Sequence, residues 1–195
     1  MESCLPKPFI EKIQKIYADK AESILASFER QRLTSIRVNT LKATVQQVEE
    51  FFEDKNIEYE KVLGIPLAFV LPYLTPREIT ELEIHQDGKI YILSLSSMLP
   101  VIVLDPQQGE HILDMTAAPG SKTSQIAAQT ENKAFITAND IDKRRLYKLK
   151  AILKQQGALN INITNYPGQT IWQRKPEFFD KVLLDAPCTM EGRFD

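Results

Sequence analysis

Short apolar runs alternate with helix-like segments throughout the second half of this sequence. The runs read as strands, because each is short, apolar and followed by turn residues, at 112–115, 135–138, 161–164 and 182–184. Between them, helical spacing of apolar residues covers 121–129 and 143–156. Strands that alternate with helices form a parallel sheet covered on both faces. Since such crossovers are right-handed, we predict a doubly wound α/β domain with four parallel strands.

The sequence before residue 107 mixes helices and strands without this regular alternation. A helical periodicity covers 9–28, and Thr44 is expected to cap a second helix, because Gln47 stands at the spacing of a capping box. Three strands and one further helix are expected at 35–39, 59–63, 88–93 and 94–104. We therefore predict a smaller α+β region at 1–106 and an α/β domain at 107–195.

The composition bounds the class of protein. Hydrophobic residues make up 43% and charged residues 26% of the chain, and the net charge is −2. This is the balance of a globular protein, and it argues against a surface covered with basic charge. A local basic cleft for nucleic acid is still compatible with it. No apolar run approaches the roughly 18 residues that span a bilayer, so we predict no membrane segment.

The chain has only two cysteines, Cys4 and Cys188, which do not make a disulfide framework in a chain of this size. No cluster of cysteine and histidine has the spacing of metal ligands, so we predict no metal site. The first residues lack the basic and apolar regions of a secretory signal. We therefore expect a cytoplasmic protein with reduced thiols.

The first candidate site is the segment 114–123, which joins the first of these strands to a helix. Ligands of open α/β sheets bind at such strand ends, and Gly120 relaxes the turn. Free N–H groups at the helix start suit a carboxylate such as that of S-adenosylmethionine. A phosphate-binding loop is disfavoured, because Met115 stands where it requires glycine. An ordinary strand-to-helix turn stays as the alternative, since many folds need small residues there.

The second candidate site is Asp140, directly after the second strand. An acidic residue about twenty positions after the loop commonly accepts hydrogen bonds from ribose hydroxyls. The alternative is a cap for the helix that begins at Lys143. Asp142 is the better cap, which leaves Asp140 free for a ligand.

The third candidate site follows the fourth strand, where Asp185 precedes Pro187 and Cys188. Pro187 stiffens the turn and cannot continue the strand, so Cys188 is expected at the lip of the cleft. A lone cysteine is more often a small buried hydrophobe, and a reactive one needs an electropositive neighbour. Lys122 is the candidate for that neighbour.

Three segments in this order resemble the Sun-type (nucleolar protein/Sun) RNA cytosine-C5 methyltransferases. Residues 117–123 are similar to their cofactor loop, residues 185–194 to their Asp-Ala-Pro-Cys motif, and residues 36–42 to their characteristic N-terminal segment. The resemblance runs from about Phe9 to the last residue. It is strongest to the bacterial members that modify small-subunit ribosomal RNA.

The resemblance implies a Rossmann-like methyltransferase domain, incomplete here, preceded by a small α+β RNA-binding domain. It implies that Asp185 polarises the target cytosine and that Cys188 helps to release the methylated RNA. Arg37, Asn39 and Lys42 would either position RNA or form the fold. The residues that it assigns to S-adenosylmethionine are Ala117, Ala118, Pro119, Gly120, Ser121, Lys122, Thr123, Asp140 and Asp185.

The chemistry of this family explains its need for cysteines. Carbon 5 of cytosine is too weak a nucleophile to attack a sulfonium methyl group directly. A thiolate adds to carbon 6, the resulting enamine takes the methyl group, a base removes the carbon 5 proton, and the thiol leaves. The target base must also be unstacked from its neighbours to reach the pocket.

The chain departs from the family pattern at two places. Pro167 stands where the family has an acidic residue that contacts adenosine, and Asn165 is the nearest replacement. The attacking cysteine of the family belongs to a Thr-Cys motif on a later strand, and no residue of this chain matches it. The fourth strand is then expected to be a sheet edge that can pair with another chain. A truncated or split gene is the first explanation, and a natural half-enzyme completed by a partner is the second.

The sequence leaves two functions open for this chain and disfavours a third. The first is transfer of a methyl group to carbon 5 of cytosine in ribosomal RNA, by a chain that is inactive alone because the nucleophile is missing. The second is a non-catalytic RNA-binding or assembly module that keeps the methyltransferase fold. A nucleotidase is disfavoured by Met115.

Overall fold

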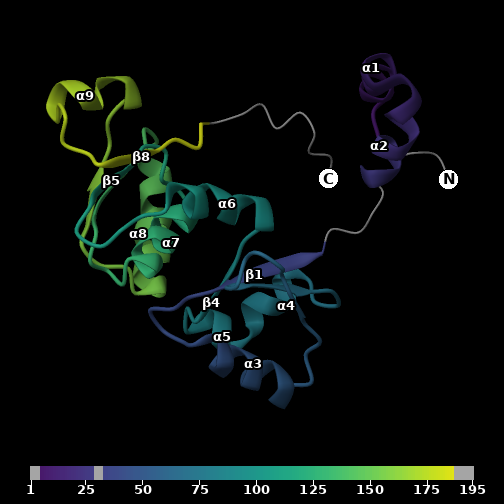
Figure 1. Ribbon diagram of the computed structural model, residues 1–195, viewed down its shortest axis with the longest axis horizontal. Helices are drawn as coiled ribbons and strands as arrows, with labels where there is room; N and C mark the ends of the chain where they lie inside the picture. The colour runs from purple at the N-terminus through teal and green to yellow at the C-terminus, as the bar shows by residue number, and fades with distance from the viewer. Residues whose placement is uncertain (1–4, 29–32, 187–195) are drawn as a thin grey trace. The chain divides into compact units, whose positions relative to one another are not determined.

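The computed structural model describes residues 5–28 and 33–186, which belong to two separate compact units (Figure 1). The first unit holds α1 (Lys7–Tyr17), the 3-10 helix η1 (Ala18–Lys20) and α2 (Ala21–Phe28). The rings of Phe9 and Phe28 meet edge to face at 5.2 Å between centroids, which packs α1 on α2. The helical prediction for 9–28 is therefore right in type but wrong in continuity, because the backbone of Ala18 turns to φ 42° and ends α1.

The second unit begins with a four-stranded antiparallel sheet in the order β2-β3-β1-β4. Its strands are β1 (Thr34–Val38), β2 (Glu60–Lys61), β3 (Ala68–Leu71) and β4 (Ile90–Ile92). Its helices are α3 (Val45–Asp54), α4 (Pro76–Glu81) and α5 (Glu83–Gln86). The core between them is formed by buried apolar side chains, among them Ile36, Val38, Val48, Phe52, Phe69 and Ile90.

The capping box predicted from Thr44 and Gln47 is confirmed. The Thr44 hydroxyl accepts a hydrogen bond from the Gln47 N–H at 3.2 Å, and the Gln47 side chain accepts one from the Thr44 N–H at 2.9 Å. β3, α4 and α5 were not predicted, because prolines punctuate the stretch around them. Pro66 and Pro72 flank β3, and Pro76 occupies the first turn of α4, where a missing N–H costs nothing.

The remainder of the second unit is a parallel sheet in the order β7-β6-β5-β8. Its strands are β5 (His111–Asp114), β6 (Phe135–Asn139), β7 (Ile161–Thr164) and β8 (Lys181–Leu183). Its helices are α6 (Leu95–Leu104), α7 (Ser121–Gln129), α8 (Lys143–Gln156), η2 (Gly168–Thr170) and α9 (Ile171–Arg174). The four parallel strands and the doubly wound order are as predicted.

Apolar side chains on one face of this sheet pack under three helices. Ile112 and Ile136 cluster with Val101 of α6 and Ile126 of α7, and Ala138 clusters with side chains of α8. Figure 1 shows α6, α7 and α8 together beside the sheet and α9 apart from them. The chain winds outward from β5 to β7 and then returns to β8 on the other side of β5. The carboxyl ends of β5 and β8 therefore form a topological switch point, where open α/β sheets bind ligands.

β8 lies at the edge of the sheet and pairs with β5 alone among the described strands. Val182 is 48% exposed and Leu184 58% exposed along this edge. The fourth parallel strand is therefore a sheet edge among the described strands, as predicted. Its pairing with another chain stays a prediction.

The two sheets share one compact unit, so the boundary at 106/107 also stays a prediction. Asn39, which follows β1, links them, because its Nδ2 donates to the carbonyl of Gly88 and to that of Gln156 in α8, both at 2.8 Å. Within the described residues, no helix is long and apolar enough to cross a membrane.

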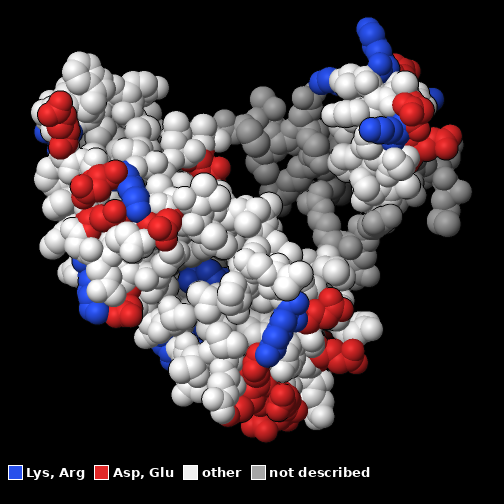
Figure 2. Space-filling view, in the orientation of Figure 1, with Lys and Arg blue, Asp and Glu red and all other residues white. Residues whose placement is uncertain are grey.

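Charged side chains are scattered over the face shown in Figure 2, with no continuous basic stripe. Acidic groups gather over α3, which carries Glu49, Glu50, Glu53 and Asp54. Nucleic acid would therefore meet local groups on this face rather than a broad positive field.

Candidate functional site

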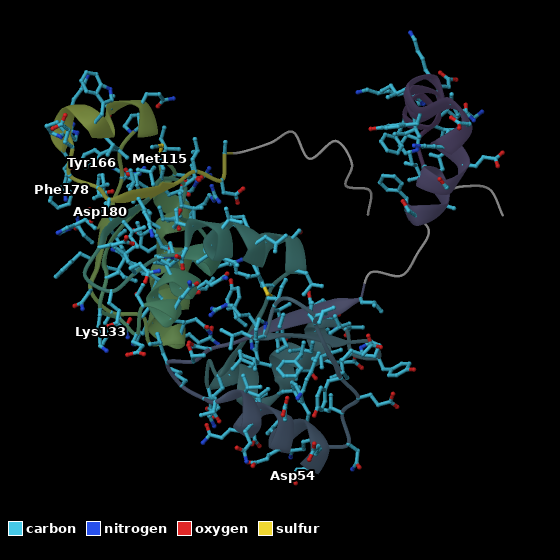
Figure 3. All side chains as sticks on the ribbon, in the orientation of Figure 1. Asp54, Met115, Lys133, Tyr166, Phe178 and Asp180 are labelled. Atoms are coloured by element: carbon cyan, nitrogen blue, oxygen red, sulfur yellow. The ribbon has the colours of Figure 1, made fainter. Side chains whose placement is uncertain are left out.

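A cavity of about 470 Å³ lies at the carboxyl ends of the parallel strands. The strand ends, the turns after them, α8 and η2 supply its lining, which is largely apolar with a few polar groups. Figure 3 labels Met115 and Tyr166 at this end of the molecule, and Asp54 of α3 far from them. The lining residues are Met115, Thr116, Asn139, Asp140, Ile141, Arg145, Tyr166, Gly168, Gln169, Leu184 and Ala186.

Asn139 holds three strand ends together under the cavity. Its side chain is buried, and its Nδ2 donates to the carbonyls of Met115 and Tyr166 at 3.0 and 2.9 Å. Its Oδ1 accepts from the Tyr166 N–H and from the Thr164 hydroxyl, both at 2.9 Å. One amide thus fixes the turns after β5 and β7 to the end of β6. Sequence reasoning did not single out Asn139, although its place beside Asp140 was a usable signal.

The turn from β5 into α7 is fixed from below by a buried pair. Thr123 donates its hydroxyl hydrogen to Asp114 Oδ2 at 2.7 Å, and both side chains are buried. Gly120 caps α7 with φ 113°, and a Cβ there would lie 2.9 Å from Leu149 Cδ1. The glycine is therefore required both by its backbone conformation and by the close approach of α8.

Burial raises the pKa of Asp114 from 3.8 to about 6, against the opposing hydrogen bond from Thr123 and the nearby charge of Lys122. A carboxyl group with such a pKa is poised to change its charge near neutral pH. Asp114 belongs to the first candidate segment, but its burial was not predicted.

The predicted cofactor loop contributes less side chain to the cavity than expected. Met115 and Thr116 line it, whereas none of Ala117 to Thr123 does. Ala117 and Ala118 are 5% and 4% exposed and pack against the core beneath α8. The run thus shapes the cavity through the course of its backbone.

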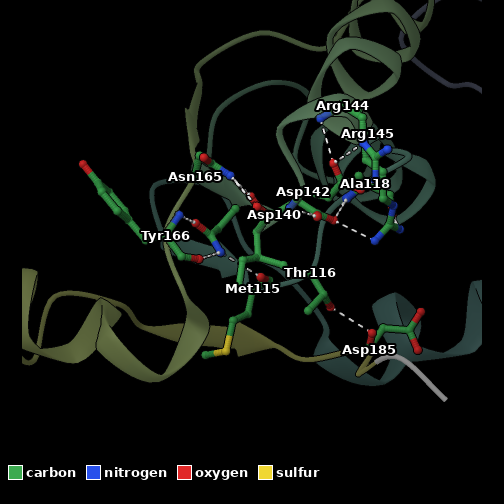
Figure 4. Close-up of polar contacts among 12 residues, drawn as sticks. Met115, Thr116, Ala118, Asp140, Asp142, Arg144, Arg145, Asn165, Tyr166 and Asp185 are labelled. Atoms are coloured by element: carbon green, nitrogen blue, oxygen red, sulfur yellow. Dashed lines mark hydrogen bonds and ion pairs between the residues drawn. The ribbon is translucent and has the colours of Figure 1, made fainter.

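Asp140 is buried at the end of β6 and holds this loop. Its Oδ2 accepts from the Ala118 N–H at 3.1 Å, its Oδ1 accepts from the Asp142 N–H at 3.0 Å, and Arg145 Nη1 lies 3.2 Å from Oδ2. Asp142 caps α8 as predicted, since its side chain accepts from the Arg144 N–H at 2.8 Å. Both oxygens of Asp140 already have protein partners (Figure 4), and its role toward a ligand stays a prediction.

Arg145 is a cavity residue that sequence reasoning missed. Besides its ion pair with Asp140, its Nη2 donates to the Ala118 carbonyl, so one guanidinium joins α8 to the loop. Its side chain is 48% exposed. The signal was its position in the first turn of a helix that follows an acidic strand end.

Asp185 lies on the other side of the switch point, after β8. Its Oδ2 is 2.5 Å from Lys122 Nζ, and its carbonyl accepts from the Thr116 hydroxyl at 2.9 Å. The Asp185 side chain is 57% exposed, whereas that of Lys122 is 12% exposed. The prediction that Lys122 neighbours Cys188 is not tested, because Cys188 and Pro187 lie outside the described residues.

The turn after β7 carries the substitution noted in the sequence. Pro167 precedes η2 and does not line the cavity, which Tyr166, Gly168 and Gln169 do. Asn165 donates from Nδ2 to the carbonyls of Asp140 and Ile141 at 2.6 and 2.9 Å. Asn165 therefore braces the end of β6, and its amide N–H groups are not available to a ligand.

The described residues contain no group of three or more histidine, cysteine or acidic side chains that could hold a metal ion.

Two family descriptions match the chain. "16S rRNA methyltransferase RsmB/F" matches residues 101–195, and "N-terminal domain of 16S rRNA methyltransferase RsmF" matches residues 5–93. The chain belongs to the RsmB/F methyltransferase family. The resemblance of the three sequence segments is thereby confirmed.

The curated relatives of this chain are longer proteins. Ribosomal RNA small subunit methyltransferase F of Aliivibrio salmonicida is 34% identical over 96% of this chain and 41% of the relative. The protein of the same name from Vibrio campbellii is 36% identical over 96% of this chain and 40% of the relative. The chain thus spans about two fifths of the length of these relatives.

Two solved structures have a fold similar to that of this chain. A methyltransferase homolog protein from Pyrococcus horikoshii is 36% identical, with a TM-score of 0.83, over 95% of this chain and 60% of that one. NSun6 from the same organism, solved with the S-adenosylmethionine analogue SFG, has a TM-score of 0.81 at 21% identity. It covers 96% of this chain and 72% of that one, and it shows a likeness of fold. The predicted Rossmann-like fold is confirmed.

Proposed function

We propose that this chain is part of an enzyme that transfers the methyl group of S-adenosylmethionine to carbon 5 of cytosine in ribosomal RNA. One observation carries the proposal: the cavity lies at the switch point between β5 and β8, with Asp140 in its wall and Asp185 beside it. RNA as partner and a cytoplasmic location belong to the same proposal. Family membership and the neighbouring methyltransferase structures support it.

The cavity has the chemical character that the cofactor needs. Ile141, Tyr166 and Leu184 provide apolar walls for an adenine ring, and Asp140 provides a carboxylate for ribose hydroxyls. Because Arg145 is half exposed, it can turn away and leave Asp140 Oδ2 to a hydroxyl. The residues that we assign to the cofactor are Ala117, Ala118, Pro119, Gly120, Ser121, Lys122, Thr123, Asp140 and Asp185.

Within this assignment the loop residues act in two ways. The backbone at the start of α7 offers N–H groups to the carboxylate of the cofactor. Thr123 acts through Asp114, because their hydrogen bond fixes where that helix begins. Pro167 gives adenosine no acceptor, so we place the base against Ile141 and Tyr166 instead.

The bound cofactor supplies an electrophilic methyl group, and the protein has to make cytosine a nucleophile. Asp185 polarises the cytosine ring, and Lys122, at 2.5 Å, orients its carboxylate. Cys188 acts as the second cysteine of the mechanism and helps to release the product RNA. The attacking thiol, which adds to carbon 6, belongs to a Thr-Cys motif that this chain does not contain.

One assay with tritiated S-adenosylmethionine and 16S ribosomal RNA tests this function. Ultraviolet cross-linking should attach the label to the chain, while the RNA should gain no methyl group. If label reached the RNA, Cys4 or Cys188 would be the attacking thiol, and the assignment of that thiol to a motif outside this chain would be wrong. If no label cross-linked to the chain, the cofactor assignment would fail.

A further inference from the structure

Arg37 is a buried cation that the proposed chemistry does not use. On β1, Ile36 and Val38 face the core of the first sheet, so the alternation of side chains turns Arg37 to the opposite face. There it is 1% exposed and meets α7, where its Nη2 donates to Ser124 Oγ at 3.3 Å.

Most of the hydrogen-bonding capacity of this guanidinium is unused. Arg37 Nε and Nη1 have no partner among the described residues, and neither has the neighbouring acceptor Gln125 Oε1. Gln125 Nε2 donates to the Met98 carbonyl at 3.0 Å, which fixes the amide. Burial lowers the pKa of Arg37 to about 10, with Tyr91 acting weakly in the other direction, so the group is still a cation at neutral pH. A buried cation with most of its N–H groups unpaired is costly, and a ligand that accepts hydrogen bonds from them would offset this cost.

Arg37 and Gln125 are both among the lining residues of a separate pocket of about 150 Å³. Its walls are apolar and come from Ile65, Leu67, Met98 and Ile102. It shares no lining residue with the cavity at the strand ends. A cavity of roughly this volume accommodates a six-membered ring such as benzene.

The chemistry of the pocket selects among ligands. A phosphate group would bring several charged oxygens against apolar walls and against the acceptor Gln125 Oε1. A flat ring with acceptors on one side and a donor beside them fits both the walls and the unpaired groups. In cytosine, O2 and N3 are acceptors that complement the Arg37 N–H groups, and the exocyclic amino group complements Gln125 Oε1. Uracil presents a donor at N3 and an acceptor at carbon 4, so it leaves these groups mismatched.

We propose that this pocket binds one cytosine base of single-stranded RNA, apart from the base that is methylated. The inference rests on RNA being the substrate class of the proposed function. Single-stranded RNA is read in this way, with bases splayed into pockets and bonded along their edges. The pocket would thus set a sequence preference next to the methylated position.

Fluorescence anisotropy with labelled hexacytidylate and hexauridylate tests the proposal on the full chain. We expect the chain to bind hexacytidylate about tenfold more tightly, the discrimination of one well-formed set of base contacts. The variant Ile102→Trp fills the pocket from its rim, where Ile102 is 38% exposed, and should abolish the preference. Val103→Trp is the matched control, because Val103 is the next residue of α6, is 82% exposed and does not line the pocket.

Gln125→Met removes the acceptor at similar volume and should also reduce the preference. Equal affinity for the two oligonucleotides would overturn the proposal. An equal loss for both in Ile102→Trp would overturn it as well, because it would indicate a phosphate site. Binding of S-adenosylmethionine, measured on the same samples, separates the two claims. A cytosine preference in a chain that does not bind the cofactor would leave this pocket standing and contradict the proposed function.

Discussion

At the scale of single residues, the candidate site depends on carboxyl groups in very different settings. Asp114 is buried under the loop, Asp140 is buried but paired with Arg145, and Asp185 is exposed and paired with Lys122. Burial penalises the charged form of a carboxyl group, and a nearby cation favours it.

The pH dependence of the free energy of unfolding should report Asp114, which forms no ion pair with another described residue. The folded-state pKa of Asp114, about 6, lies above the ordinary value of 3.8. The neutral acid therefore favours folding below about pH 4, and this contribution is lost as the pH rises through the folded pKa. In Asp114→Asn the group does not titrate, while an acceptor for Thr123 remains. Between about pH 4 and 7, we expect the wild type to lose up to about 3 kcal/mol of stability relative to this variant. Urea unfolding at a series of pH values measures it, and parallel curves would contradict it.

At the scale of elements, Asn139 should contribute more to stability than its small side chain suggests. Asn139→Ala removes hydrogen bonds to the turns after β5 and β7 and leaves buried partners unsatisfied. We expect a loss of about 2–4 kcal/mol in the free energy of unfolding, measured with urea. Asn162→Ala, at an exposed position of β7, is the matched control and should change little. Similar losses in both variants would mean that the strand ends are held by something else.

The turn into α7 gives a second prediction at this scale. Gly120→Ala adds strain at φ 113° and a clash with Leu149, so we expect a loss of about 2–4 kcal/mol in thermal or urea unfolding. Gly109→Ala is the control, because Gly109 also has positive φ, at 84°, but has open space around its Cβ position. It should cost only about 1 kcal/mol of backbone strain. Equal costs would show that the approach of α8 is not tight.

The elements also show what the sequence could and could not predict. The helices of the parallel-sheet region were predictable, and the predicted bounds of α7 and α8 agree with the structure. β3 was not predictable, because it has only four residues between Pro66 and Pro72 and becomes a strand by pairing with β1. At the site, strand ends were predictable from the pattern. The ties made by Asn139 and Arg145 were not, since they depend on which strand ends become neighbours.

At the scale of the whole molecule, the exposed edge of β8 should promote association with another chain. An apolar edge strand presents unpaired backbone groups, and a charged residue on it blocks pairing. We expect sedimentation velocity to show association that grows with concentration and falls in Val182→Lys. Val103→Lys, on the exposed side of α6, is the control. Association that is equal in all three proteins would rule out the edge as the contact.

We propose that the cavity at the carboxyl ends of the parallel strands binds S-adenosylmethionine through Asp140. Isothermal titration of the chain with the cofactor tests it most directly, alongside Asp140→Asn and the control Asp54→Asn on distant α3 (Figure 3). We predict one bound cofactor per chain, affinity at least about tenfold weaker in Asp140→Asn, as expected for a lost charge-assisted hydrogen bond, and no change in Asp54→Asn. No binding to the wild type, or equal affinity in Asp140→Asn, would contradict the account.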